Sequence, residues 1–187
     1  NTHICAQKDN IDIWLTHAAK KPDSWRRTSG CHGGNTSADL ERDQFQPVNN
    51  PYAVTPEQIF TLMDQFLSEQ TPHSESGGVH TSALVSGTNI LFQIHDIGRH
   101  NTFDKIAGRI LLDKLDIQNP VLITSGRISS DMVQKSIRMQ IPLLISMRSA
   151  SQMGIQLADQ WGITSIGGAR RGRFNVFSHP QRILIPG

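Results

Sequence analysis

The chain has 187 residues, enough for one domain with a sizeable hydrophobic core. Its 18 basic and 16 acidic side chains leave a formal net charge of only +2, which argues against a strongly basic protein that coats nucleic acid. No apolar stretch approaches the roughly 20 residues of a membrane span, and residues 1–20 lack the apolar run of a signal peptide. Composition therefore predicts a cytoplasmic protein with no nucleic-acid partner and no membrane partner.

The first predicted elements hold the two cysteines of the chain. Residues 2–6 are predicted to form a strand, in which Cys5 is expected to be a small buried side chain. Residues 28–36 have three glycines and no hydrophobic periodicity, so Cys31 is expected on an exposed, flexible loop. Basic residues nearby in the sequence favour its thiolate form. An accessible thiolate of this kind suits a persulfide carrier or a covalent nucleophile.

Helices and strands alternate after a polar, acidic stretch at residues 39–50, which is predicted to be an exposed loop. Pro56 opens a helix whose expected N-cap is Thr55. The elements predicted after it are strands at 79–85 and 90–94, a helix capped by Asn101, a strand at 121–124, a helix from Ser129 or Ser130 to Met139, a strand at 143–147, a helix at 151–161, and strands at 164–166 and 174–177. This alternation indicates βαβ units and a sheet covered by helices on both faces. The predicted domains are an N-terminal strand region with the Cys31 loop, residues 1–54, and an α/β ligand-binding domain, residues 55–187.

Three predicted strands are followed by loops in which an arginine lies beside glycine or hydroxyl residues. These arginines are Arg99, Arg127 and Arg148. The carboxyl ends of parallel strands meet at one edge of a sheet, where helix N-termini present free N–H groups. The three loops therefore predict a pocket for a phosphate-bearing ligand, although each loop alone is equally typical of an ordinary turn.

The distribution of charge supports this prediction. Residues 1–95 hold 6 basic and 10 acidic side chains, whereas residues 96–187 hold 12 and 6. Seven basic residues of the second half are arginines in or beside predicted loops: Arg99, Arg127, Arg148, Arg170, Arg171, Arg173 and Arg182. The second half is thus a candidate surface for an anion, and an ordinary solvated basic face is the alternative.

Motifs of several other activities are missing from the sequence. His95 and His100 do not have the spacing of metal ligands, and the P-C-x-x-C motif of zinc nucleobase deaminases does not occur. The sequence has no Walker A motif, which disfavours a P-loop NTPase, and no G-x-G-x-x-G after a strand, which disfavours a dinucleotide-dependent dehydrogenase. It also has no G-x-S-x-G elbow, which disfavours an α/β-hydrolase. No metal bound by protein side chains is expected.

Several ordered motifs match a known family. They are residues 77–84 (GGVHTSAL), 96–101 (DIGRHN) with Asp104 and Lys105, 124–135 (TSGRISSDMVQK), 148–150 (RSA) and 171–177 (RGRFNVF). With these motifs the chain resembles the formate dehydrogenase accessory family, FdhD/NarQ, the sulfur carriers of molybdenum-cofactor maturation. The resemblance implies an α/β fold, a three-layer α/β/α arrangement with a mixed sheet that is similar to cytidine deaminases without their zinc. It also implies a homodimer and a β-rich region ahead of the first residue of this chain.

The resemblance further implies a sulfurtransferase activity. Family members accept sulfur from a cysteine desulfurase as a persulfide on a loop cysteine, which corresponds to Cys31, and serve formate dehydrogenase. The expected cargo is Mo-bis(molybdopterin guanine dinucleotide), whose pyrophosphates suit arginine side chains. The residues expected to bind this cofactor are Gly168, Ala169, Arg170, Arg171, Gly172, Arg173, Arg99, His100, Arg127, Ser129 and Arg148.

Two positions depart from the family pattern. Gly34 replaces the second cysteine of the usual CxxC in the loop, and Ser151-Gln152 replaces Pro-Thr after the RSA motif. The lone loop cysteine keeps a second hypothesis open: a non-catalytic chaperone that binds the molybdenum cofactor or a guanine nucleotide.

Overall fold

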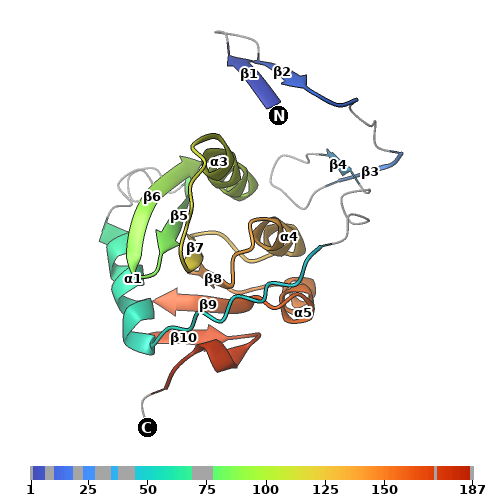
Figure 1. Cartoon of the computed structure of the whole chain (residues 1–187). Coiled ribbons are helices and arrows are strands. Elements are labelled where there is room, and N and C mark those ends of the chain that lie inside the picture. The colour runs from blue at the N-terminus through green and yellow to red at the C-terminus, as the bar shows by residue number, and fades with distance from the viewer. Residues whose placement is uncertain are drawn as a thin grey trace. The chain divides into compact units, whose positions relative to one another are not determined.

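A computed structural model describes residues 2–6, 11–18, 23–27, 35–37, 45–68, 78–170 and 172–185. The chain divides into two compact units (Figure 1), an N-terminal unit that contains β1 to β4 and a larger unit that contains every later helix and strand. None of the helices in these ranges is long and apolar enough to cross a membrane.

The N-terminal unit contains two short antiparallel hairpins. β1 (Thr2–Ala6) pairs with β2 (Ile11–Leu15), and β3 (Trp25–Arg27) pairs with β4 (Asn35–Ser37). The strand predicted at residues 2–6 is confirmed, but the expectation that Cys5 is buried is wrong, because this residue is exposed. All five residues of β2 are exposed as well.

The larger unit is built on a six-stranded sheet with the order β10-β9-β8-β7-β5-β6. Its strands are β5 (His80–Ser86), β6 (Asn89–Asp96), β7 (Pro120–Thr124), β8 (Leu143–Ser146), β9 (Thr164–Arg170) and β10 (Arg173–Val176). β7, β8 and β9 run parallel, whereas β5 is antiparallel to both β6 and β7, and β10 is antiparallel to β9. The sheet is therefore mixed, as predicted.

Helices cover both faces of this sheet (Figure 1). The helices are α1 (Pro56–Ser68) on one face and α3 (Arg99–Leu112), α4 (Ser130–Arg138) and α5 (Gln152–Gln160) on the other. Successive strand residues point to opposite faces, so Leu122 and Leu144 pack with α3, α4 and α5, while Val121 and Ile145 pack with α1. Because both faces of the central strands are apolar and covered, the predicted three-layer α/β/α fold is confirmed.

The ends of three helices also match the sequence prediction. Thr55 and Gln58 form a reciprocal capping box at α1: Gln58 N–H donates to Thr55 Oγ1 (3.3 Å), and Thr55 N–H donates to Gln58 Oε1 (2.8 Å). Ser129 and Ser151 occupy the N-cap positions of α4 and α5. The polar residue before each apolar run therefore indicates where the helix begins.

The segment before α1 packs on the larger unit. Val48 is 2% exposed and its N–H donates to Trp161 O (2.9 Å), Phe45 makes an edge contact with the Trp161 ring, and Val54 forms a parallel bridge with Ile183. The larger unit thus begins at Phe45 rather than after residue 54. The prediction of an exposed loop is wrong at Phe45 and Val48. These two apolar residues lie in a stretch of mostly polar sequence, which gave no sign that they pack against other residues.

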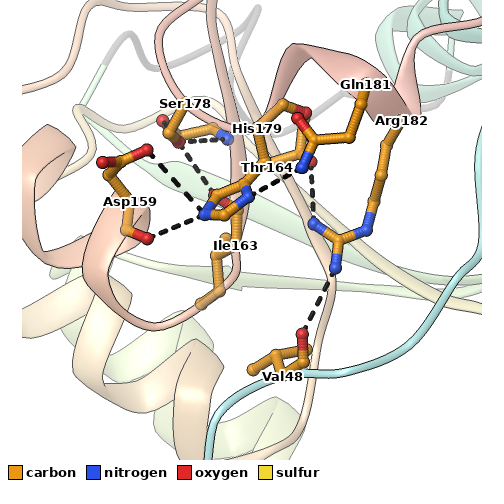
Figure 2. A network of polar contacts seen from close by, with 9 residues as sticks. Val48, Asp159, Ile163, Thr164, Ser178, His179, Gln181 and Arg182 are labelled. Atoms are coloured by element: carbon orange, nitrogen blue, oxygen red, sulfur yellow. Dashed lines mark hydrogen bonds and ion pairs between the residues drawn. The ribbon is translucent and has the colours of Figure 1, made fainter.

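Arg182 holds this segment in place (Figure 2). Its guanidinium donates to Asn50 O (3.1 Å), Val48 O (3.2 Å) and Thr164 Oγ1 (3.2 Å). Because Thr164 begins β9, Arg182 lies at the edge of the sheet opposite the carboxyl ends of the parallel strands. It is a structural residue, and the expectation that it belongs with the anion-binding arginines is wrong.

Candidate functional site

Four strands of the larger unit end at the same edge of the sheet. β7, β8 and β9 are parallel, and β6 has the same direction because β5 is antiparallel to both β6 and β7. Arg99 follows β6, Arg127 follows β7, Arg148 follows β8, Arg170 ends β9 and Arg173 begins β10. The structure thus brings the predicted arginine loops together, although β5 separates β6 from the other three strands.

Asp96, the last residue of β6, sets the start of α3. Its Oδ1 accepts hydrogen bonds from Gly98 N–H (2.8 Å) and Asn101 Nδ2 (2.9 Å), and its Oδ2 pairs with Lys105 Nζ (2.5 Å). The prediction that Asn101 caps the helix is wrong: α3 begins at Arg99, and Asn101 braces the preceding turn through the carboxylate. Asp96 therefore positions Arg99 at the edge of the site.

The Asp96 carboxylate is expected to stabilise the fold in a pH-dependent way. The hydrogen bond from Lys105 and those from Gly98 and Asn101 lower the pKa of Asp96 from 3.8 to about 2, against the opposing effect of burial. A lowered folded-state pKa means that the stabilisation is complete above about pH 4 and is lost as the pH falls toward 2. In urea titrations, Asp96→Asn should reduce the free energy of unfolding at pH 7 by about 1–2 kcal/mol. The difference from the unaltered chain should shrink between pH 4 and 2, and a difference that stays constant with pH would contradict the assignment.

A cavity of about 480 Å³, here called the helix cavity, opens where three helices begin. Arg99, Ser130 and Gln152, the first residues of α3, α4 and α5, all line it, together with Arg127. Helix N-termini favour anions because their first N–H groups have no partner within the helix. Ser129, the N-cap of α4, also lines the cavity, and its buried Oγ has no hydrogen-bond partner among the described residues. The helix cavity therefore offers donors and positive charge to an anionic group.

A second cavity of about 420 Å³, here called the hairpin cavity, lies between the loop after β8 and the β9–β10 hairpin. Arg148, Arg170, Arg173 and Asn175 line it. Ser149 lines both this cavity and the helix cavity, so the two adjoin. Their arrangement suits a ligand with more than one anionic group.

Two glycines allow β9 to approach the Arg148 loop closely. Gly168 has a positive φ of 63°, and its N–H donates to Arg148 O (2.9 Å). A Cβ added at Gly167 would lie 2.5 Å from Phe177 Cε2 and 2.8 Å from Arg148 O, so no side chain fits there. These glycines shape the wall of the hairpin cavity.

The linings of the two cavities, as far as the structure describes them, carry positive charge. Neither lining includes an aspartate or a glutamate. Arg127, Arg148, Arg170 and Arg173 are exposed, whereas Arg99 is only 6% exposed and its side chain crosses Gly126, where a Cβ would lie 3.0 Å from Arg99 Cβ. Within the described ranges, no group of three or more histidine, cysteine or acidic side chains is placed to hold a metal ion. The chemistry that the site supports is anion binding.

The remaining predicted site residues lie in different places. His100 lines neither cavity, and burial together with the nearby positive charges of Arg99 and Lys135 lowers its pKa, which favours the neutral ring. Ala169 is 1% exposed and packs in the core beside α1, so its side chain faces away from the cavities. Gly172 has a φ of 74° in the turn between β9 and β10. Cys31 and Arg171 lie outside the described residues.

Sequence reasoning missed a set of buried hydroxyl groups beneath the two cavities. Ser82, Thr102, Thr124 and Ser146 are all 0% exposed. The sequence places Thr124 and Ser146 in the arginine loops and Ser82 in a family motif, but it does not indicate that these side chains and Thr102 contact one another. A polar residue inside an otherwise apolar, fully covered strand was the signal that could have identified them.

Comparison with known proteins relates this site to a family. The FdhD/NarQ family model matches residues 2–184. The chain belongs to the FdhD/NarQ family. Sulfur carrier protein FdhD from Bacillus subtilis (strain 168) is 36% identical over 130 residues, which cover 70% of this chain and 50% of that protein. Sulfur carrier protein FdhD from Wolinella succinogenes is 34% identical over 157 residues, 83% of this chain and 54% of that protein.

A solved structure agrees with this family membership. The crystal structure of a formate dehydrogenase accessory protein from Desulfotalea psychrophila matches with a TM-score of 0.71 and 32% sequence identity, over 79% of this chain and 62% of that chain. This FdhD/NarQ chain spans about half the length of the curated relatives it matches. The fold expected from the sequence is therefore that of a family member of known structure.

Proposed function

We propose that this chain carries sulfur for the maturation of formate dehydrogenase. It accepts sulfur on Cys31 from a cysteine desulfurase and holds Mo-bis(molybdopterin guanine dinucleotide) as its cargo at the arginine-lined edge of the sheet. The names of its relatives support a sulfur carrier. The proposal also has the chain work in the cytoplasm as a homodimer.

The observation that carries the proposal is the pair of adjoining cavities that arginine side chains line. A guanine dinucleotide presents pyrophosphates, which are bound by arginine and by helix N-termini. The helix cavity offers Arg99 and Arg127, and the hairpin cavity offers Arg148 and Arg173. The residues present therefore fit a cargo with two anionic groups that are held a short distance apart.

Sulfur transfer to Cys31 requires no external oxidant. The Cys31 thiolate attacks the outer sulfur of the persulfide on the desulfurase. The sulfur–sulfur bond of the donor breaks, its cysteine leaves as a thiolate, and a new sulfur–sulfur bond forms on Cys31. In a second exchange of the same kind, a thiolate of the acceptor attacks the outer sulfur of the Cys31 persulfide, a new sulfur–sulfur bond forms on the acceptor, and Cys31 leaves as a thiolate.

The transfer is expected to add sulfur to Cys31 and not to Cys5. Because Cys5 is exposed in the structure, accessibility alone does not distinguish the two thiols, and both must be tested. After incubation with a cysteine desulfurase and cysteine, intact-mass measurement should show one added sulfur atom in the unaltered chain and in Cys5→Ala. Cys31→Ala should remain unmodified, and an adduct that persists in Cys31→Ala but disappears in Cys5→Ala would overturn the assignment.

A second candidate function is a chaperone that holds the cofactor without sulfur chemistry. Gly34, at the position of the family's second loop cysteine, favours it, because no neighbouring thiol can relay a persulfide from Cys31. The chaperone predicts that Cys31→Ala restores formate dehydrogenase activity as fully as the unaltered chain in a strain with a maturation defect. A sulfur carrier predicts no restoration by this variant.

A further inference from the structure

Four fully buried hydroxyl groups lie beneath the two cavities. They belong to Ser82 in β5, Thr102 in α3, Thr124 in β7 and Ser146 in β8, and none of them lines either cavity. A buried hydroxyl loses its hydrogen bonds to water and must recover them inside the protein. Apolar side chains of similar size would fill the same space without that requirement.

The first three hydroxyls connect Arg99 to the loop of Arg127. Ser82 Oγ donates to Thr124 Oγ1 (3.0 Å) and lies 2.7 Å from Thr102 Oγ1. Thr102 Oγ1 also lies 2.7 Å from Arg99 O, and its single proton is donated either to that carbonyl or to Ser82 Oγ. Thr124 Oγ1 in turn accepts the Gly126 N–H (3.1 Å). These close polar contacts connect the first residue of α3, across β5, to the residue before Arg127.

Ser146 extends the connection to Arg148. Its Oγ donates to Gly126 O (2.5 Å) and accepts the Arg148 N–H (2.9 Å). Arg148 O then accepts the Gly168 N–H (2.9 Å). The chain of hydrogen bonds thus reaches the backbone of the loops after β6, β7 and β8 and the end of β9, which together form the walls of both cavities.

We infer that Ser82, Thr102, Thr124 and Ser146 are positioning residues that fix the spacing of the arginines for an anionic ligand. This inference rests on the proposed function, because it concerns the same site. The hydroxyls act on the ligand only through the backbone of Arg99, Gly126 and Arg148. Their contribution is to hold the loops in place before the ligand binds, which reduces the ordering that binding must supply.

Paired substitutions at Thr124 separate the hydroxyl from the packing. Thr124→Val keeps the shape and removes the hydroxyl, whereas Thr124→Ser keeps the hydroxyl and removes a methyl group. Calorimetric titration with GDP, used as a probe with one pyrophosphate, should show affinity reduced about threefold to tenfold in Thr124→Val, the equivalent of one lost hydrogen bond. Thr124→Ser should bind GDP as the unaltered chain does, even if it is less stable.

Ser165→Ala is the matched control. Ser165 is also a fully buried hydroxyl of the same sheet, with its Oγ 2.6 Å from Ser178 Oγ, but it lies near the start of β9, away from the cavities. The Ser165→Ala variant should be less stable than the unaltered chain and should bind GDP with the same affinity. Equal GDP affinity in Thr124→Val and Thr124→Ser, or an equal loss in Ser165→Ala, would show a purely structural role and overturn the inference.

A measurement without ligand separates this inference from the proposed function. Thr124→Val should accelerate amide hydrogen exchange at Arg148, a residue that the Thr124 hydroxyl reaches through Gly126 and Ser146. Unchanged exchange at Arg148 would overturn the inference whether or not GDP binds. If the unaltered chain fails to bind GDP, the proposed site fails, and the exchange result still decides whether the hydroxyls hold the loops.

Discussion

Gly167→Ala is expected to lower the free energy of unfolding by about 2–3 kcal/mol and to weaken anion binding at the hairpin cavity. The added Cβ would lie 2.5 Å from Phe177 Cε2 and 2.8 Å from Arg148 O. The Phe177 ring can turn aside, but the Arg148 carbonyl is backbone and can move only with its loop. That movement would disturb the hydrogen bond from Gly168 N–H to Arg148 O (2.9 Å) and displace the Arg148 side chain. Urea unfolding and GDP titration measure the two effects.

Two further variants distinguish this steric explanation from a general effect of adding a methyl group. Gly108 lies inside α3, and a Cβ there would meet nothing within 4 Å. Gly108→Ala should therefore stabilise the fold by about 0.5–1 kcal/mol and leave GDP affinity unchanged. Combining Gly167→Ala with Phe177→Leu should recover part of the lost stability and little of the lost affinity, because the contact with Arg148 O remains. Full recovery of affinity would show that the ring, and not the loop, carries the effect.

The sequence predicted most of the larger unit because its signals are local. Apolar runs of strand length at Val121 and Leu143, alternating with capped helices, were enough to predict the parallel strands and both covered faces. Because the carboxyl ends of parallel strands meet at one edge of a sheet, the sequence also predicted that Arg99, Arg127 and Arg148 lie at the same edge. Packing of Val48 against Trp161 was not predictable, because it joins residues far apart in the chain and Val48 lies in a polar stretch.

The loops that form the site were predictable from the sequence, but the shape of the cavities between them was not. The cavities depend on which strands are neighbours, and only the structure shows that β5 enters the sheet between β6 and β7. Asp96 and Asn101 both belong to the motif at residues 96–101, yet the contact between their side chains depends on the path of the turn between β6 and α3. The hydroxyls of Ser82 and Thr124 meet because their strands pair in register. Spacing along the chain contains none of this information.

Arg182→Ala is expected to lower the free energy of unfolding by about 2–3 kcal/mol without any direct effect on the site. The guanidinium of Arg182 donates to Val48 O and Thr164 Oγ1, both at 3.2 Å (Figure 2). It also donates to Asn50 O at 3.1 Å. Its removal leaves two backbone carbonyls and one hydroxyl without that partner and frees the segment before α1. Arg182→Lys should recover only part of the loss, because a single ammonium group cannot reproduce the planar fork that reaches three acceptors.

Arg173→Ala is expected to give the opposite result to Arg182→Ala: a loss of ligand affinity with little loss of stability. The charge distribution counts both Arg173 and Arg182 among the arginines of the second half, but only Arg173 lies in a motif that resembles the family and is expected to bind the cofactor. Arg173 is exposed and lines the hairpin cavity, so Arg173→Ala should change the free energy of unfolding by less than about 0.5 kcal/mol. Its affinity for GDP should fall about tenfold, as expected for a lost charged hydrogen bond to a phosphate. If Arg173→Ala lost stability while Arg182→Ala lost affinity, the anion site would belong at the other edge of the sheet. The two measurements, made on the same four proteins, therefore decide which edge of the sheet binds the ligand.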